Sequence, residues 1–226
     1  MKIGIIGAGH IGGTLARRLS ALGHDVSIAN SRGPESLAGL EKETGVKAVT
    51  VPEAARGKDI VIVTIPEKSV LDLPRDLFAG DDHVVVVDTG NYYPQRDGRI
   101  AVIEDGTPES QWVAQQIGHT VIKAFNTIYA KHLMERGRGA DQSGRIALPI
   151  AGDDAAAKSI VMRLIDELGF DAVDTGRLAD SWKQQPGTPI YGTDLSSEAA
   201  ERALAAASRT RPLEFRAPPP RAASAR

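Results

Sequence analysis

The chain has 226 residues, 42% of them hydrophobic and 25% charged, which is ordinary globular composition and enough for one large domain or a main domain with a smaller partner. A net charge of −2 excludes a global field that would recruit nucleic acid or a membrane, and the lack of cysteine excludes disulfides and thiol chemistry. The five histidines show no metal-ligand spacing, so we expect no metal. No apolar run approaches a membrane span and no leader pattern precedes the first strand, so we expect a cytoplasmic protein.

Short β-branched runs alternate with longer segments of helical period along the chain. This alternation predicts βαβ units and a parallel sheet with helices on both faces. In chain order, the predicted strands cover residues 2–6, 25–30, 47–51, 59–65, 83–88, 120–125, 145–151 and 170–175. The predicted helices cover residues 11–22, 34–44, 68–78, 108–117, 129–136, 153–168 and 194–208.

These elements predict the α/β class, with a doubly wound parallel-sheet Rossmann domain over residues 1–142 and a small C-terminal α/β segment over residues 143–208. The boundary falls in a glycine-rich polar stretch near residues 139–144. Residues 209–226 hold five arginines against one acid and several prolines. Because this tail has few core-forming side chains, we predict that it is disordered and dispensable for cofactor binding.

A glycine-rich loop joins the first predicted strand to the first predicted helix and fits the pattern G-x-G-x-x-G. Gly7 allows the tight turn, Gly9 lets backbone amides approach a pyrophosphate, and Gly12 permits close packing of the helix on the strand. The helix N-terminus adds the positive end of a helix dipole. His10 and Ile11 lie inside the loop, and His10 is either a pyrophosphate contact or a solvated loop residue. The pattern therefore predicts a dinucleotide-binding site.

The end of the second predicted strand bears on which dinucleotide binds. NAD-specific proteins of this fold place an Asp or Glu there for the adenosine ribose hydroxyls. This chain has Asn30, Ser31 and Arg32 instead. The missing carboxylate removes repulsion against a 2′-phosphate, which Arg32 can grip with its planar fork and Ser31 can hydrogen-bond. We therefore predict NADP(H). The alternative interpretation places Ser31 and Arg32 in a solvated loop.

Three segments, GIIGAGHIGGTLARRLSALGHDVSIANSR, VIVTIP and VIKAFNTI, resemble the family of NADP oxidoreductases that use the deazaflavin coenzyme F420. The resemblance runs from Met1 to about Thr127 and continues more weakly through PIAGDDAAAKSIVMRLIDELGFDAVDTGRL. It implies an N-terminal Rossmann domain, a small C-terminal domain, and a cleft in which the deazaflavin stacks near the nicotinamide. A flavin-bearing metalloreductase domain and the N-terminal domain of pyrroline-5-carboxylate reductase are related resemblances.

The same resemblance implies roles for individual residues. It assigns the three loop glycines to the pyrophosphate, and Ser31 with Arg32 to the 2′-phosphate. Thr64, Ile65 and Pro66 would flank the nicotinamide ribose. Asn126 and Thr127 would lie beside the reacting rings as acceptor contacts, at a place where the family carries a histidine instead of Asn126. The segment after Thr188 also departs from the family, which has an apolar C-terminal segment there.

The residues themselves leave further alternatives open. Asn91 follows the fifth predicted strand and is either a hydrogen-bond donor to the nicotinamide amide or a substrate, or a turn former. Asn126 is either a ring contact or a helix N-cap. Trp182 and Tyr191 could wall a flat ligand or enter the core of the small domain. The chain has no Tyr-x-x-x-Lys pair, and this absence favours ring-to-ring hydride transfer over reduction that needs a proton donor.

We therefore predict an NADP(H)-dependent oxidoreductase that passes a hydride between NADPH and a flat redox acceptor, such as F420 or a flavin. One alternative is an NADPH-dependent reductase of small imines or carbonyls. Another is a module that senses NADPH without catalysis. The expected partner is a small-molecule redox acceptor, with a homodimer as the candidate assembly and no nucleic acid or membrane. The sequence does not name the acceptor, the hydride stereochemistry or the oligomeric state.

Overall fold

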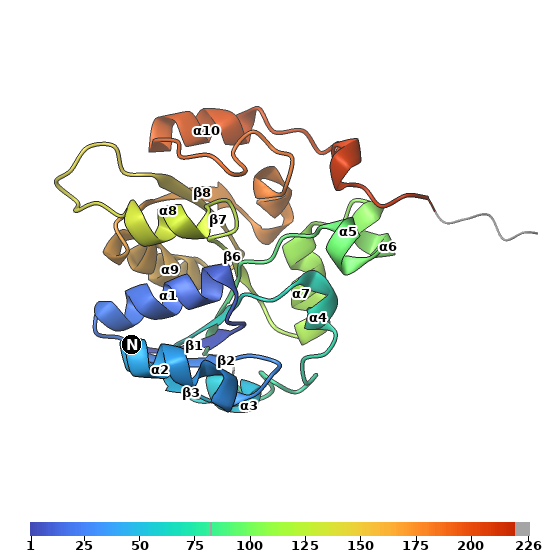
Figure 1. Ribbon diagram of the computed structural model, residues 1–226. Helices are drawn as coiled ribbons and strands as arrows, with labels where there is room; N and C mark the ends of the chain where they lie inside the picture. Colours follow the sequence, from blue (N-terminus) through green and yellow to red (C-terminus); the bar gives the residue numbers. More distant parts are fainter. Residues whose placement is uncertain (82, 220–226) are drawn as a thin grey trace, which may run out of the picture.

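The computed structural model describes residues 1–81 and 83–219. The strands of this described part are β1 (Lys2–Ile6), β2 (Asp25–Ala29), β3 (Lys47–Ala48), β4 (Ile60–Val63), β5 (Val85–Asp88), β6 (Ile122–Lys123), β7 (Ala147–Ala151) and β8 (Asp171–Gly176). They form one sheet in the order β3-β2-β1-β4-β5-β6-β7-β8 (Figure 1). Neighbouring strands pair in parallel except β6 and β7, which are antiparallel. The first six strands have the doubly wound order, so the predicted fold is confirmed.

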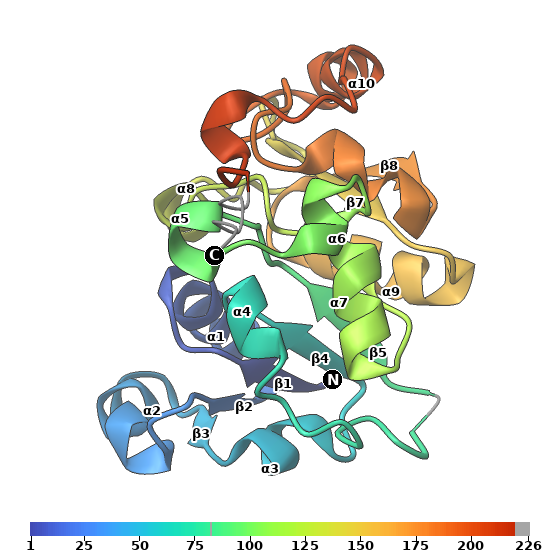
Figure 2. The ribbon, with the colours of Figure 1, turned by 90° about the vertical axis from the view of Figure 1, so that its right-hand side faces the viewer.

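The helices are α1 (His10–Ala21), α2 (Ala38–Thr44), α3 (Val51–Ala55), α4 (Glu67–Val70), α5 (Pro94–Asp97), α6 (Ala101–Glu104), α7 (Glu109–Ile117), α8 (Ala130–Glu135), α9 (Ala155–Glu167) and α10 (Ser197–Ala205). Three short 3-10 helices are η1 (Pro34–Leu37), η2 (Leu178–Gln184) and η3 (Leu213–Phe215). Helices lie on both faces of the sheet (Figures 1 and 2).

Two hydrophobic clusters explain why the central strands are apolar without interruption. Along β4, Ile60 and Ile62 belong to the cluster that includes α1, α8 and α9, whereas Val61 and Val63 belong to the cluster that includes α3, α4 and α7. Successive side chains of a strand point to opposite faces, so a strand covered on both faces must be apolar at every position. The sheet therefore has a packed layer of helices on each side.

The C-terminal segment extends the same sheet and adds a small core of its own. Strands β7 and β8 continue beyond β6, and a third cluster joins β7 and β8 to α10 and Ile190. Helix α9 begins after Asp154, whose side chain accepts hydrogen bonds from the amides of Ala156 and Ala157. This N-cap follows the acidic start that the sequence indicates. The two parts of the chain are thus joined through one continuous sheet.

Several predicted elements are shorter in the structure, and two of them end early for a clear physical reason. The helix expected over residues 68–78 stops at Val70, because Pro74 cannot donate to a helical hydrogen bond and disfavours helix in the residue before it. The strand expected over residues 47–51 stops at Ala48, and helix α3 begins at Val51 instead. Thr50 and Glu53 form a capping box there, with the Thr50 amide 2.9 Å from the Glu53 carboxylate.

The described part of the predicted tail is docked, which corrects the expectation of disorder for residues 209–219. Arg211 donates to Glu109, and the amide of Ala217 donates to Glu104, at 2.8 Å in each case. The ring of Phe215 lies 6.2 Å from that of Tyr93. The sequence hid these contacts because each partner lies about a hundred residues away. Residues 220–226, the rest of that tail, lie outside the described residues.

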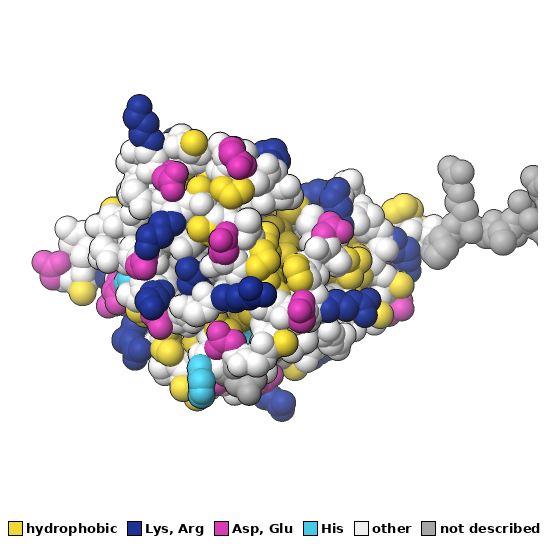
Figure 3. Space-filling model, turned by 90° about the horizontal axis from the view of Figure 1, so that it is seen from below, with side chains coloured by type: hydrophobic (Ala, Val, Ile, Leu, Met, Phe, Trp, Pro, Cys, Tyr) yellow, Lys and Arg dark blue, Asp and Glu magenta, His cyan; other side chains and the backbone are white. Residues whose placement is uncertain are grey.

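Lys, Arg, Asp and Glu side chains are mixed on the face seen from below, with hydrophobic side chains between them (Figure 3). Within residues 1–81 and 83–219, no helix has both the length and the apolar character that a membrane crossing requires.

Candidate active site

The glycine loop joins the carboxyl end of β1 to the start of α1. Gly7 has φ 111°, and a Cβ on it would lie 2.5 Å from the carbonyl oxygen of Thr64. A Cβ on Gly12 would overlap the carbonyl oxygen of Gly7, whereas a Cβ on Gly9 would meet no atom within 4 Å. Gly7 and Gly12 are therefore required by packing, and Gly9 faces open space. This is the arrangement that the sequence pattern predicts for an approaching pyrophosphate.

Thr64 ties the loop that follows β4 to the glycine loop. Its hydroxyl donates to the carbonyl oxygen of Gly7 at 2.8 Å, and its amide donates to Ile6. Ile65 and Pro66 follow as half-buried residues. These three residues thus belong to the loop next to the glycine loop, and the Thr64 hydroxyl holds the backbone of Gly7 in place. Their contact with a nicotinamide ribose stays a prediction.

The loop after β2 is shaped by Asn30. Its side-chain oxygen accepts from the amide of Arg32 at 2.9 Å, and its side-chain nitrogen donates to Ser36 at 2.8 Å. This Asx turn leaves Ser31 and Arg32 exposed. In the described part of the chain, the Arg32 guanidinium has no ion-pair or hydrogen-bond partner. Asn30 therefore has a structural role here, and Arg32 is free to bind an anion.

One cavity of about 610 Å³ joins the glycine loop, the loop after β2 and helix α8. Gly9, His10 and Arg32 line it, and α8 contributes Lys131 and Met134. His10 is exposed at this cavity, whereas the neighbouring Ile11 is half-buried and packs against the core. Sequence reasoning missed α8 as a wall of the cavity, because only the fold shows that α8 packs beside α1.

A second polar region lies inside the protein, between β5, β6 and α7. The ammonium of Lys123 lies 3.2 Å from Asp88 and also donates to the carbonyl oxygen of Gly90, while the Ser110 hydroxyl donates to Asp88 at 2.6 Å. All four residues are buried. Burial lowers the pKa of Lys123, but the nearby carboxylates of Asp88, Glu109 and Glu67 raise it by more. The net pKa is above its ordinary value, so this lysine stays charged.

Two buried glutamates complete this region, which we call the buried charge cluster (Glu67, Asp88, Glu109 and Lys123). Arg96 donates to Glu67 at 3.0 Å, and Arg211 donates to Glu109 at 2.8 Å. The second oxygen of each glutamate has no hydrogen-bond partner within the described residues. Burial raises the pKa of Glu67, and the neighbouring Glu109 raises it further; burial also raises the pKa of Glu109. Each carboxyl therefore retains its proton at a higher pH than an exposed one.

Asn126 lies in a closed network of amide side chains. Its side-chain nitrogen donates to the side-chain oxygen of Asn91 at 3.0 Å and to the carbonyl of Gln184 at 2.7 Å. Gln184 donates back to the side-chain oxygen of Asn126 at 3.0 Å. The residue before Asn126, Phe125, is buried with φ 60°, a conformation rare outside glycine. Asn126 thus joins three segments that are distant in sequence.

The start of helix α8 excludes one of the two interpretations of Asn126. Helix α8 begins at Ala130 with Tyr129 as its N-cap, so the N-cap interpretation of Asn126 is wrong. Thr127 is also buried, and its carbonyl accepts from the amide of Gly192 at 2.9 Å. The hydrogen bonds of Asn126 favour a positioning role. Direct contact of Asn126 or Thr127 with an acceptor stays a prediction.

Comparison with known proteins identifies the protein family. Residues 2–92 match the family model described as NADP oxidoreductase, coenzyme F420-dependent. A crystal structure of the hypothetical protein SMa0349 of Sinorhizobium meliloti is 34% identical, with 86% of this chain and 95% of that chain covered and a TM-score of 0.76. The chain belongs to the family of coenzyme F420-dependent NADP oxidoreductases. The predicted family, and with it the class of NADP-dependent oxidoreductases, is therefore confirmed.

Two further relatives show how far this family likeness extends. The "putative f420 dependent nadp-reductase" of Arthrobacter sp. FB24 is 25% identical, with 80% of this chain and 87% of that chain covered and a TM-score of 0.67. Metalloreductase STEAP3 of Rattus norvegicus is 29% identical over 183 residues, which are 80% of this chain and 35% of the rat protein. This oxidoreductase spans less than half the length of the curated relatives it matches.

A pair of tyrosines lies next to the amide network of this oxidoreductase, and sequence reasoning did not pair them. The hydroxyl groups of Tyr93 and Tyr191 hydrogen-bond each other, and both side chains are half-buried. Burial raises the pKa of both phenols, so they are neutral hydrogen-bond donors near pH 7.

In the part of the chain that the structure describes, no group of three or more His, Asp or Glu residues is arranged to hold a metal ion.

Proposed function

We propose that this protein is an NADPH-dependent oxidoreductase that transfers a hydride between NADPH and a flat redox acceptor, such as deazaflavin F420 or a flavin. The observation that carries the proposal is the cavity shared by the glycine loop and Arg32. A dinucleotide pyrophosphate and a 2′-phosphate are two anions that such a cavity would receive together. The acceptor is a small molecule, and its identity rests on the family likeness.

The residues present fit the NADP(H) cofactor. Gly9 leaves room at the N-terminus of α1 for a pyrophosphate, since a Cβ there would meet no neighbouring atom. Arg32 and Ser31 would hold the 2′-phosphate, because both are exposed and no carboxylate ends β2. The nicotinamide supplies the hydride when bound. The chain would bind the pyrophosphate and the 2′-phosphate and orient the nicotinamide ring, with Thr64 fixing the glycine loop.

For the acceptor, we propose the surface around Asn126 and Thr127 beside Asn91. The amide network holds these segments together, and the half-buried Tyr93 and Tyr191 supply aromatic area beside them. Asn126 acts in this proposal by positioning Asn91 and the backbone of Thr127. Exclusion of water from two stacked rings requires such a rigid, mostly apolar wall.

The cofactor assignment is tested by measuring NADPH and NADH affinity in the unmutated protein and in Arg32→Ala. We expect NADPH to bind at least about tenfold more tightly than NADH, since a charge-assisted pair contributes about 1.5–3 kcal/mol. Arg32→Ala should remove most of this difference and leave NADH affinity unchanged. Arg177→Ala is the matched control, since Arg177 is an exposed arginine paired with Asp153 on another surface. Equal NADPH and NADH affinities in the unmutated protein would contradict the assignment.

The acceptor is tested by following NADPH oxidation with F420, FMN, FAD, ferric chelates and a panel of imines and carbonyls. Turnover with F420 or a flavin supports the proposal. Tight NADPH binding without turnover of any acceptor would instead make the protein an NADPH-sensing module.

Reduction of a small imine or carbonyl is a second candidate, and the Tyr93–Tyr191 pair is the observation that favours it. Such a reduction needs a positioned proton donor, and Tyr93, two residues after Asn91, is half-buried and hydrogen-bonded to the second phenol, Tyr191. Tyr93→Phe would then lower kcat for the imine or carbonyl by about 10²-fold or more. If Tyr93→Phe leaves kcat unchanged, the pair has only a structural role.

A further inference from the structure

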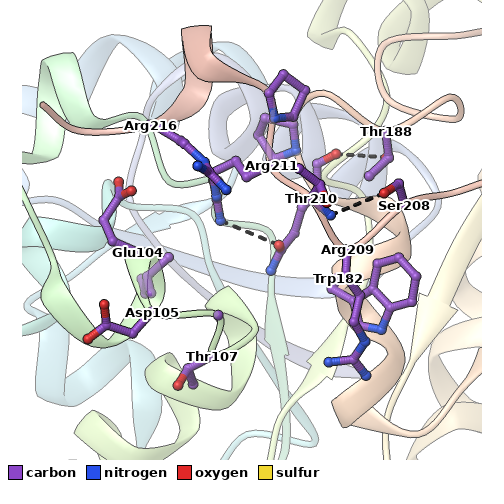
Figure 4. Close-up of a pocket in the computed structure, with 15 residues that line it drawn as sticks. Glu104, Asp105, Thr107, Trp182, Thr188, Ser208, Arg209, Thr210, Arg211 and Arg216 are labelled. Carbon is purple, nitrogen blue, oxygen red and sulfur yellow. Dashed lines mark hydrogen bonds between the residues drawn. The ribbon is translucent and has the colours of Figure 1, made fainter.

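A second cavity, of about 410 Å³, lies where the docked tail crosses α6 and η2 (Figure 4). We call it the tail cavity. It is lined by the end of α6, the end of η2 and residues 208–212 with Arg216, and it shares no lining residue with the cavity at the glycine loop. Its chemistry is therefore separate from the proposed cofactor site.

Three side chains that line the tail cavity each carry a buried hydrogen-bond donor without an acceptor in the described part of the chain. They are the side-chain nitrogen Nε2 of Gln185, the indole Nε1 of Trp182 and the guanidinium Nη1 of Arg211. Gln185 is only 8% exposed. Buried donors almost always have a partner in a folded protein, because an unpaired N–H loses its hydrogen bond to water. Three such donors on one cavity indicate that a ligand supplies the acceptors.

The side chains that carry these donors are fixed in place. Arg211 donates through Nη2 to Glu109 at 2.8 Å and to the side-chain oxygen of Gln185 at 3.4 Å, which leaves Nη1 and the Gln185 nitrogen without partners. The guanidinium of Arg209 lies 5.0 Å from the centre of the Trp182 ring. Neither Arg209 nor Arg216 forms an ion pair within residues 1–81 and 83–219. This wall of the cavity thus presents donors and positive charge.

The opposite wall limits what can bind. Glu104 and Asp105 line it, on the other side of the cavity from Trp182 in Figure 4. The Glu104 carboxylate accepts from the amide of Ala217, which holds it beside the tail. Two carboxylates there would repel a ligand that carries many negative charges. The cavity suits a small molecule with one anionic group and an uncharged or cationic remainder.

We propose that the tail cavity binds a small molecule through one oxyanion group, a phosphate or a carboxylate, held by Gln185, Trp182 and Arg211. Arg209 and Arg216 add positive charge at the same wall. Guanidinium, amide and indole N–H groups are all donors, so only an acceptor-rich group satisfies the set. The proposal does not depend on the identity of the cofactor or of the redox acceptor.

Titration with inorganic phosphate at constant ionic strength tests the proposal, with Trp182 as the reporter. Trp112→Phe leaves Trp182 as the single tryptophan, and calorimetry on the unmutated protein gives a second measurement. We expect a saturable change in fluorescence and a matching heat of binding. Glycerol phosphate and acetate, titrated in parallel, distinguish a phosphate from a carboxylate ligand; a saturable response to either supports the proposal.

Gln185→Glu is the decisive variant. It keeps the side-chain shape and the oxygen that faces Arg211, but it replaces the free donor with a carboxylate. We expect it to weaken binding of the anion at least tenfold while its melting temperature shows the tail still docked. Arg177→Gln, at an exposed ion pair elsewhere, should change nothing. No saturable response to any of the three anions, or equal affinity in Gln185→Glu, would overturn the proposal.

Arg32→Ala separates this site from the cofactor site. It should leave the phosphate response of Trp182 unchanged while it lowers NADPH affinity. If Arg32→Ala removes the phosphate response, the anion binds at the glycine loop and the tail cavity is not its site. If NADPH affinity fails to depend on Arg32 but Gln185→Glu still abolishes the phosphate response, the cofactor assignment fails and the tail cavity stands.

Discussion

The glycine-loop cavity and the buried charge cluster lie at the same end of the sheet but use their polar groups in opposite ways. At the cavity, Arg32 is exposed and its guanidinium has no partner among residues 1–81 and 83–219, and the N-terminus of α1 faces the same open space. In the cluster, Lys123 and Asp88 are buried and pair with each other. The charged group of a ligand site is left unpaired for the ligand. The charged groups of the internal cluster instead form ion pairs and hydrogen bonds that join the strands, α7 and the tail. Variants at the two regions should therefore affect different measurements.

The largest effect is expected from Lys123→Met. This change leaves the carboxylates of Asp88, Glu67 and Glu109 without their buried cation, and removal of one partner from a buried ion pair costs about 3–5 kcal/mol. Urea unfolding measures the loss in the free energy of unfolding. Lys47→Met is the control, because Lys47 pairs with Asp25 on the surface and should cost no more than about 1 kcal/mol. Similar costs for the two variants would show that the cluster does not depend on its lysine.

Removal of residues 209–226 should have the next largest effect. Truncation after Ser208 removes Arg211 from the buried Glu109 and removes the ring of Phe215 from Tyr93. We expect a loss of about 2–3 kcal/mol, less than for Lys123, because Glu109 can take up a proton once Arg211 is gone. Thermal unfolding checks this value, and NADPH affinity should stay unchanged. A melting temperature equal to that of the full chain would restore the sequence-based view of a dispensable tail.

A matched pair of glycine variants tests the glycine-loop cavity in the same way. Gly12→Ala forces a Cβ against the carbonyl of Gly7 and should cost about 1–3 kcal/mol of stability. Gly9→Ala adds its Cβ to open space and should change stability by no more than about 0.5 kcal/mol while it lowers NADPH affinity. Unfolding and binding measured on both variants test this. If Gly9→Ala binds NADPH normally, the pyrophosphate does not approach Gly9.

The smallest effect concerns pH and the buried carboxyls. Burial raises the pKa of Glu67 and Glu109 above their ordinary value of 4.5, so the folded protein binds protons that the unfolded chain has released. This contribution to stability is present below pH 4.5 and is lost as the pH rises through the folded pKa values. Glu67→Gln should make this decline with pH shallower, because a glutamine side chain has no proton to release. Unfolding curves at several pH values above 4.5 check the slope, and an unchanged slope would mean that Glu67 is ionised in the folded state.

The fold class and the glycine loop could be predicted from the sequence, because both depend on local patterns. The alternation of strands and helices gave the sheet, and Gly7, Gly9 and Gly12 fall within six residues. The hydrogen bond between Thr64 and Gly7 was not predicted, because the family likeness placed Thr64 beside the nicotinamide ribose and not against the glycine loop.

The amide network and the buried charge cluster could not be predicted from the sequence, because they depend on contacts between distant residues. Asn126 meets Gln184 across 58 positions, and Glu109 meets Arg211 across 102. A polar residue in an amphipathic helix, such as Glu109, looks like a solvated one until its neighbours are known. The same limit applies to the tail: its composition predicts disorder, but its contacts lie on α6 and α7, which are distant in sequence.

The ion pair between Glu109 and Arg211 also constrains the order of events during synthesis. A ribosome adds about 5–20 residues per second, so it needs about 5–20 s to add the 102 residues between the two partners. Throughout that interval the nascent chain already contains α7 but lacks the guanidinium that Glu109 faces. Until Arg211 is made, either α7 stays unpacked with Glu109 in water, or α7 packs on the sheet with the Glu109 carboxyl protonated. Synthesis of the segment that contains Arg211 then becomes the step that fixes this layer in place, and chains that stall before Arg211 would leave the layer open to proteases.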